Sequence, residues 1–221
     1  MAVAVDATST AGGSGVISLP HVCSGTNRLL LMFVCDWTGS DSGSVTVAPR
    51  YAGIGLTQHT THAFSTARCE LWYLINPATG SNPLAYTLGV VAAVAALSVT
   101  GAHQTTPLPQ VVSAINGPNP PASAALTVPS GDLWAECLSV LCSGSALSPG
   151  AGFVQQATIA PCNPKAILAT QAGTGASLTD TWTGTYGDGR YADLALWVQQ
   201  APGAITPTVP TTKQALLGVG G

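Results

Sequence analysis

The sequence predicts an all-β fold, an antiparallel β-sandwich over residues 1–199 followed by an extended arm over residues 200–221. Runs of β-branched, aromatic and aliphatic residues recur about every 8–12 residues, which is the spacing of sandwich strands, and no helical period competes with them. The chain holds 25 glycines and 16 prolines, which favour many turns. Its hydrophobic content of 46% is ample for one large core.

Three runs are apolar at both odd and even positions, namely Arg28–Trp37, Arg68–Ile75 and Leu133–Cys142. The side chains of a strand alternate between the two faces of its sheet, so such a run is covered on both faces. One cover is the core of the domain. We expect the second cover to come from outside the sandwich, which makes these strands the first pointer to function.

The N-terminal segment predicts an edge strand at Val3–Thr10, a turn at Gly12–Gly15 and a second edge strand at Val16–Val22, which contains Pro20. Asn76–Asn82 has turn chemistry, and Gly101–Pro121 is a long polar connection. The remaining expected strands are, in chain order, Val45–Ala48, Leu56–His59, Leu84–Leu88, Val90–Thr100, Ala124–Val128, Phe153–Ile159, Ala166–Gln171, Ser177–Thr183 and Tyr191–Gln199.

The composition changes after residue 200, where prolines replace the alternating pattern. Proline restricts φ and lowers the entropy that an extended segment loses on docking. The segment is therefore either an arm that docks through an apolar tip or a loose terminus. The tip holds Leu216, Leu217 and Val219.

Two classes of partner are excluded, nucleic acid by the charge of the chain and a membrane by the length of its apolar runs. Only 7% of the residues are charged, the net charge is −3, and the six basic residues are scattered singly, so no cluster is available for nucleic-acid phosphates. The longest apolar run, Val90–Leu97, is too short to span a membrane. A chain with so little charge favours a packed assembly over a free monomer.

Five segments resemble a jelly-roll-like β-sandwich module of tailed-phage virion proteins, with related modules in bacterial surface proteins. They are SGTNRLLLMFV (24–34), VAPRYAGIGLT (47–57), ARCELWYLINPATG (67–80), VTGAHQTTPL (99–108) and SGDLWAECL (130–138). The resemblance covers residues 3–199 and is greatest to capsid decoration, or cement, proteins. Its motifs are structural and imply no catalytic residue.

The reactive side chains predict neither a catalytic site nor a metal or cofactor site. His59 and His62 lie near Cys69, but zinc needs four convergent ligands at recognisable spacings. Cys137 and Cys142 are five residues apart, so a strand directs them to opposite faces. With no export signal ahead of them, the six cysteines are expected to be reduced core residues.

Two clusters in the last third of the chain have alternative interpretations. The first is Asp180, Asp188 and Asp193, which could bind calcium, although a hairpin turn at 187–189 explains Asp188 without an ion. The second cluster is aromatic, and it would form a glycan-stacking platform if exposed; strand aromatics more often belong to a core. Its members are Trp182, Tyr186 and Tyr191.

These observations favour a non-enzymatic virion structural protein, with capsid decoration as the expected role, assembled in the host cytoplasm. The expected partners are copies of the same chain, with a trimer as the closed symmetry that the resemblance implies, and the major capsid protein or another virion protein. The alternatives are a tail or baseplate component and a carbohydrate-binding adhesion module. The expected interface residues are Trp72, Leu74, Leu216, Leu217 and Val219.

Overall fold

The computed structural model describes residues 1–36, 44–64, 67–115, 122–140, 147–159, 165–184 and 191–203. These residues form fourteen strands, all paired antiparallel, so the all-β antiparallel prediction is confirmed. No helix in the described ranges is long and apolar enough to cross a membrane.

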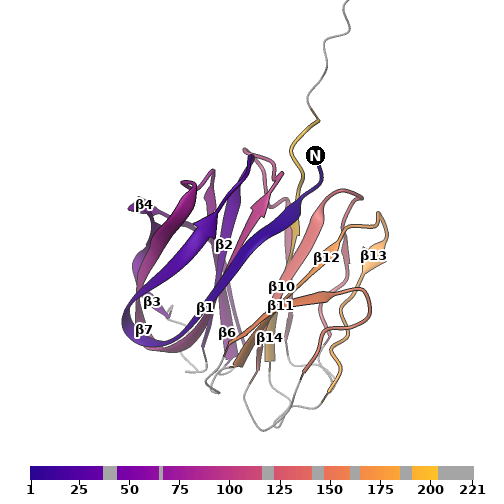
Figure 1. Cartoon of the computed structure of the whole chain (residues 1–221). Helices are drawn as coiled ribbons and strands as arrows, with labels where there is room; N and C mark the ends of the chain where they lie inside the picture. Colours follow the sequence, from indigo (N-terminus) through magenta and orange to yellow (C-terminus); the bar gives the residue numbers. More distant parts are fainter. Residues whose placement is uncertain are drawn as a thin grey trace, which may run out of the picture.

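The strands build three layers, which run from left to right in Figure 1. One bent sheet supplies the first two layers, and a five-stranded sheet is the third. The bent sheet contains β1 (Ala4–Cys23), β2 (Leu29–Asp36), β3 (Val45–Tyr51), β4 (Ile54–Gly55), β5 (Thr57–Phe64), β6 (Ala67–Ile75) and β7 (Gly80–Thr100). The third layer has the order β11 (Val154–Ile159), β12 (Lys165–Ala172), β10 (Leu133–Val140), β14 (Tyr191–Val198) and β8 (Gln110–Ile115).

The bend lies in the long β1–β7 ribbon. Gly13 pairs with Ala92 but Gly15 pairs with Leu88, so the register shifts where both strands turn from one layer into the next. The φ angles of Gly13 and Gly15 are 142° and 79°, values that residues with a Cβ rarely adopt. The predicted turn at Gly12–Gly15 is therefore a bulge inside one strand.

The same bend joins two further predicted strands, Leu84–Leu88 and Val90–Thr100, into β7. The part of β7 before the bend pairs with β3, and the part after the bend pairs with β2. Pro20 does not end β1. This strand pairs with β7 on one side only, and an edge strand tolerates a residue that lacks an N–H.

A row of polar side chains joins the two halves of β1, so that the bent sheet is nearly closed. Ser9 Oγ donates to the Pro20 carbonyl at 3.1 Å and lies 3.0 Å from His21 Nδ1. Asp6 accepts a hydrogen bond from the Ser24 N–H at 2.7 Å. Burial lowers the pKa of His21 to about 4, so this imidazole is neutral at pH 7.

The second face of β2 and β6 is covered by this chain itself, which corrects the expectation of an outside cover. Leu29, Leu31 and Phe33 of β2 face the third layer, where they pack with residues such as Leu168 and Leu194. The intervening β2 residues face the first layer, where a second core encloses Leu30, Met32 and Val34 with Trp72, Leu84, Tyr86 and Leu88.

The outer face of β10 is also covered from within the chain. Trp134 packs with Leu126 of β9 (Leu126–Thr127) and with Val128, which follows this strand. Further along, Leu138 and Val140 pack in a separate core that includes Leu147, Ile167, Trp182 and Tyr191. β9 pairs with β13 (Ser177–Leu178), so loops and a two-stranded ribbon close this side.

Two further expectations need correction. The predicted connection Gly101–Pro121 contains an edge strand, β8, and the expected strand Ser177–Thr183 is reduced to β13. Hydrogen bonds to the domain continue past residue 199, the predicted boundary of the sandwich. Gln200 donates its N–H to Asp132 Oδ1 at 2.8 Å, and Ala201 donates to the Gly101 carbonyl at 2.7 Å. Residues 204–221 lie outside the described ranges.

The two cores can be tested separately with neighbouring residues of β2. Leu31→Ala opens a cavity in the core against the third layer, and Leu30→Ala opens one in the core of the bent sheet. Each should lower the free energy of unfolding by about 2–5 kcal/mol, measured by urea denaturation at one fixed protein concentration. The control Val154→Ala, at a side chain that is 58% exposed, should change it by less than about 0.5 kcal/mol. A Leu30→Ala variant as stable as the control would contradict a self-covered sheet.

Truncation locates the true end of the folded unit. Removing residues 204–221 should leave thermal unfolding unchanged. Removing residues 200–221 should destabilise the domain by about 1–3 kcal/mol, because Asp132, which is buried, then loses a hydrogen bond. Equal melting temperatures for the two truncated chains would restore the boundary at residue 199.

Candidate functional site

The described surface has almost no charge. Seven of the nine acidic residues are described, and six of them are buried: Asp36, Glu70, Asp132, Glu136, Asp180 and Asp193. The seventh, Asp6, is half-buried and bonded to Ser24. Arg50 is the one exposed charged side chain in the described ranges. The fold therefore places most of the described carboxylates inside.

One pair of these acids, Asp36 and Glu70, shares a single buried cation in the bent sheet. Arg68 Nε donates to Asp36 Oδ2 at 2.8 Å and lies 3.7 Å from Glu70 Oε1. Glu70 also accepts the Trp72 indole N–H at 3.1 Å, and the backbone N–H of Ser44 donates to it. This network fixes charges in a core, and its function is structural.

A second acidic group, Glu136, Asp180 and Asp193, lies under the outer cover of the third layer. Glu136 accepts the Trp134 indole N–H at 3.1 Å, and Asp180 accepts the Gly150 N–H at 2.6 Å. Both carboxylate oxygens of Asp193 and one oxygen each of Glu136 and Asp180 have no hydrogen-bond partner.

Burial is the largest cause of the raised pKa values of Glu136 and Asp193. The negative charge of Asp193 raises the pKa of Glu136 further, and the charge of Asp180 does the same to Asp193. The expected calcium group thus comes together in part, since Asp180 and Asp193 meet, whereas Asp188 lies outside the described residues. Glu136 was missed, although a charge inside a run apolar on both faces is the signal that could have found it.

Three cysteines from two layers converge in the core between the bent sheet and the third layer. Cys35 and Cys69 are directly opposite each other on β2 and β6, and Cys137 comes from β10. The Cys35 sulfur lies 3.2 Å from that of Cys69 and 3.6 Å from that of Cys137. All three sulfurs lie within 4.8 Å of one another, and all three side chains are completely buried.

Hydrogen bonding with the Cys137 and Cys69 thiols lowers the pKa of Cys35 to about 6, whereas burial raises the pKa of Cys69. Cys23, the other described cysteine, is buried in the core of the bent sheet and is also a free thiol. Cys142 lies outside the described residues, so the comparison of its face with that of Cys137 cannot be made. His62 is opposite Cys69 in the register of β5 and β6, but its side chain is outside the described part.

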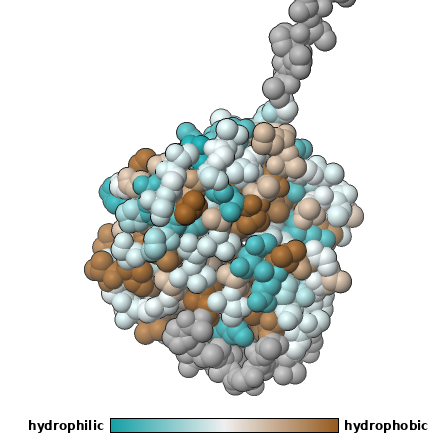
Figure 2. All heavy atoms as spheres, in the orientation of Figure 1, coloured by the Kyte–Doolittle hydropathy of each residue, from teal (hydrophilic) through white to brown (hydrophobic). Residues whose placement is uncertain are grey.

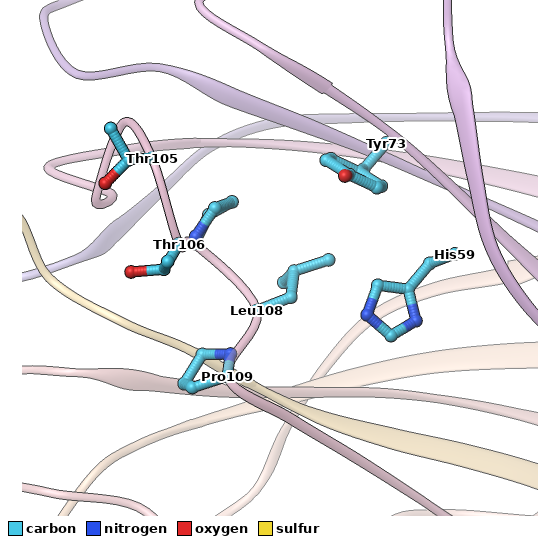
Figure 3. Close-up of a pocket in the computed structure, with 7 residues that line it drawn as sticks. His59, Tyr73, Thr105, Thr106, Leu108 and Pro109 are labelled. Carbon is cyan, nitrogen blue, oxygen red and sulfur yellow. The ribbon is translucent and has the colours of Figure 1, made fainter.

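A surface pocket of about 440 Å³ lies between β5–β6 and the connection before β8. Figure 3 shows His59 and Tyr73 on one side and Thr105, Thr106 and Leu108 facing them. The imidazole and phenol rings meet edge to face, with centroids 6.0 Å apart. Burial lowers the pKa of His59. The pocket lining holds no carboxylate or thiol, and its titratable side chains are those of His59 and Tyr73.

The outer surface of the first layer carries exposed valines, which we call the valine face. Val16 of β1 and Val47 of β3 both pair with Thr87 of β7, so they lie in one row on one side of the sheet, and they are 84% and 55% exposed. Val22 lies further along β1 on the same side and is 44% exposed. Figure 2 shows hydrophobic surface at the left of the molecule, over the region of β3 and β7.

The four predicted contact residues that the structure describes are buried or partly buried. Trp72 is only 9% exposed and donates to Glu70, and Leu74 is partly buried against the core of the bent sheet. Trp182 and Tyr191 are buried in the core outside β10, so these two rings form no exposed glycan platform. The other predicted residues lie outside the described ranges, namely Tyr186, Leu216, Leu217 and Val219.

Comparison with known proteins identified no relative. No family of known proteins, no curated protein and no solved structure matches the chain.

The raised carboxyl pKa values predict a pH-dependent stability. A carboxyl group whose pKa is raised by folding stabilises the fold fully below its unfolded pKa, which is about 4, and that stability is lost as the pH rises towards the raised value. Glu136→Gln should therefore match the wild type near pH 4 and be more stable at pH 8, by about 1–3 kcal/mol.

Glu70→Gln is the matched control, because Glu70 also accepts an indole N–H but contacts Arg68. It should destabilise the protein at pH 8, since it removes one member of a buried ion pair. Denaturant unfolding at the two pH values measures both variants. A Glu136→Gln variant that is less stable than wild type at pH 8 would show that Glu136 is ionised and paired.

Proposed function

We propose that the chain is a non-enzymatic structural protein of a tailed-phage virion, a jelly-roll-like subunit that decorates the capsid and stabilises the shell through subunit contacts. The observation that supports this most is the nearly uncharged surface. A freely soluble domain exposes many charged side chains, about a quarter to a third of its surface residues. In the described part of this chain, Arg50 alone does so.

A surface of this kind is stabilised when a partner covers it. Burying apolar area stabilises an interface by about 25 cal/mol per Å². The valine face offers such area on three neighbouring strands, where Val16, Thr87 and Val47 form one row and Ser18, Ala85 and the exposed Arg50 form the next. Its partner in this proposal is a second copy of the chain.

The virion role is tested on particles made by the genome that encodes the chain. Mass spectrometry of gradient-purified particles should find the chain in many copies, in proportion to the major capsid protein. Particles made without its gene should lose DNA at a lower temperature. A chain absent from particles contradicts the proposal, and a few copies that co-purify with isolated tails would assign it to the tail or baseplate.

Self-association has a separate test in sedimentation velocity at micromolar concentration. The wild type should sediment as one closed oligomer, with the trimer as the expected size. Val16→Lys combined with Val47→Lys places charges in the proposed contact and should yield monomers. Val154→Lys, at an equally exposed valine of β11, should leave the oligomer intact. A wild-type protein that is a monodisperse monomer would refute this contact.

A further inference from the structure

The three converging cysteines come from positions that the sequence keeps far apart. Residues 35 and 69 become neighbours through the register of β2 with β6, and residue 137 reaches them only because β10 packs across the core. Their sulfurs approach from two layers at separations of 3.2 Å and 3.6 Å. No solvent-exposed residue is among the three.

These separations fit a shared metal ion. Zinc binds thiolate sulfur at about 2.3 Å, so two sulfurs of a tetrahedral site are about 3.8 Å apart. The sulfurs here lie close to that value and all within 4.8 Å of one another, so small side-chain rotations would equalise them. We propose that Cys35, Cys69 and Cys137 form a structural binding site for Zn²⁺ between the bent sheet and the third layer.

The site also contains an unsatisfied polar group. The Ser139 hydroxyl is completely buried and has no hydrogen-bond partner. Ser139 lies two residues from Cys137 on the same face of β10 and beside the Cys35 thiol. A buried hydroxyl without a partner is costly, so this part of the core is polar as well as rich in thiols.

The chemistry of the donors selects the ion. Calcium and magnesium take oxygen ligands, whereas thiolates select zinc and copper(I). Three thiolates with Zn²⁺ leave one net negative charge, and with Cu⁺ they leave two. Because a dry core penalises uncompensated charge, Zn²⁺ is favoured. A bound ion would tie β2 and β6 to β10, and the complete burial of its three ligands would keep substrate away from it.

The test uses full-length protein produced with added zinc and purified with reductant but without chelator. Elemental analysis should find close to one equivalent of zinc in the wild type. Cys137→Ser removes one ligand with little change in volume. It should hold at least about tenfold less zinc, since loss of even an outer hydrogen-bond partner costs roughly 10–100-fold in metal affinity. Cys23→Ser is the matched control, because Cys23 is equally buried but lies in the other core, and it should keep the zinc.

A second measurement avoids dependence on a variant that fails to fold. Wild-type protein unfolded in denaturant and refolded with Co²⁺ should develop the thiolate-to-cobalt charge-transfer absorption, and added Zn²⁺ should abolish it. Wild-type protein that holds no zinc and gives no cobalt band would overturn the proposal. So would zinc retained undiminished by Cys137→Ser, or a Cys35–Cys69 disulfide found by mass spectrometry in protein alkylated at lysis.

Discussion

The bend of the β1–β7 ribbon is the constraint on which the rest of the structure depends. A single ribbon belongs to two layers, so the sheet that packs on the third layer also covers its own second face. Without the bend, Leu30, Met32 and Val34 would face solvent. Gly13 and Gly15 allow the bulge on one strand. Gly89 allows close approach on the other, since a Cβ there would lie 2.8 Å from Thr46 Cγ2.

Covering β2, β6 and β10 on both faces leaves their charged residues inside, and the fold accommodates them in two ways. Glu70 and Glu136 each accept an indole N–H at 3.1 Å, from Trp72 and Trp134. Glu70 also lies 3.7 Å from the guanidinium of Arg68. Glu136 instead faces other carboxyl groups, so burial and repulsion favour its protonated form. A rise in pH therefore weakens the fold around Glu136.

The sequence predicted the strands well where local pattern decides them and poorly where register or bending does. Arg68–Ile75 and Leu133–Cys142 correspond closely to β6 and β10. β8 was missed because QVVSAI lies in a proline-bearing connection and does not alternate between apolar and polar residues. Its pairing to β14 makes it a strand. The thiol group depends on strand register and on the packing of two sheets, which no spacing along the chain reveals.

The completeness of the cores bears on how such a subunit would join a particle. When folding needs a neighbour's strand or side chains, subunit and shell form together. Here both faces of β2, β6 and β10 are closed by the chain's own residues, so the described domain has nothing left to complete. Its contacts would be made by an already folded surface, through uncharged side chains such as those of the valine face. In the proposed role, the subunit would therefore fold first and attach afterwards. Such an order suits a decoration protein, which is added to an existing shell, better than a protein that builds the shell.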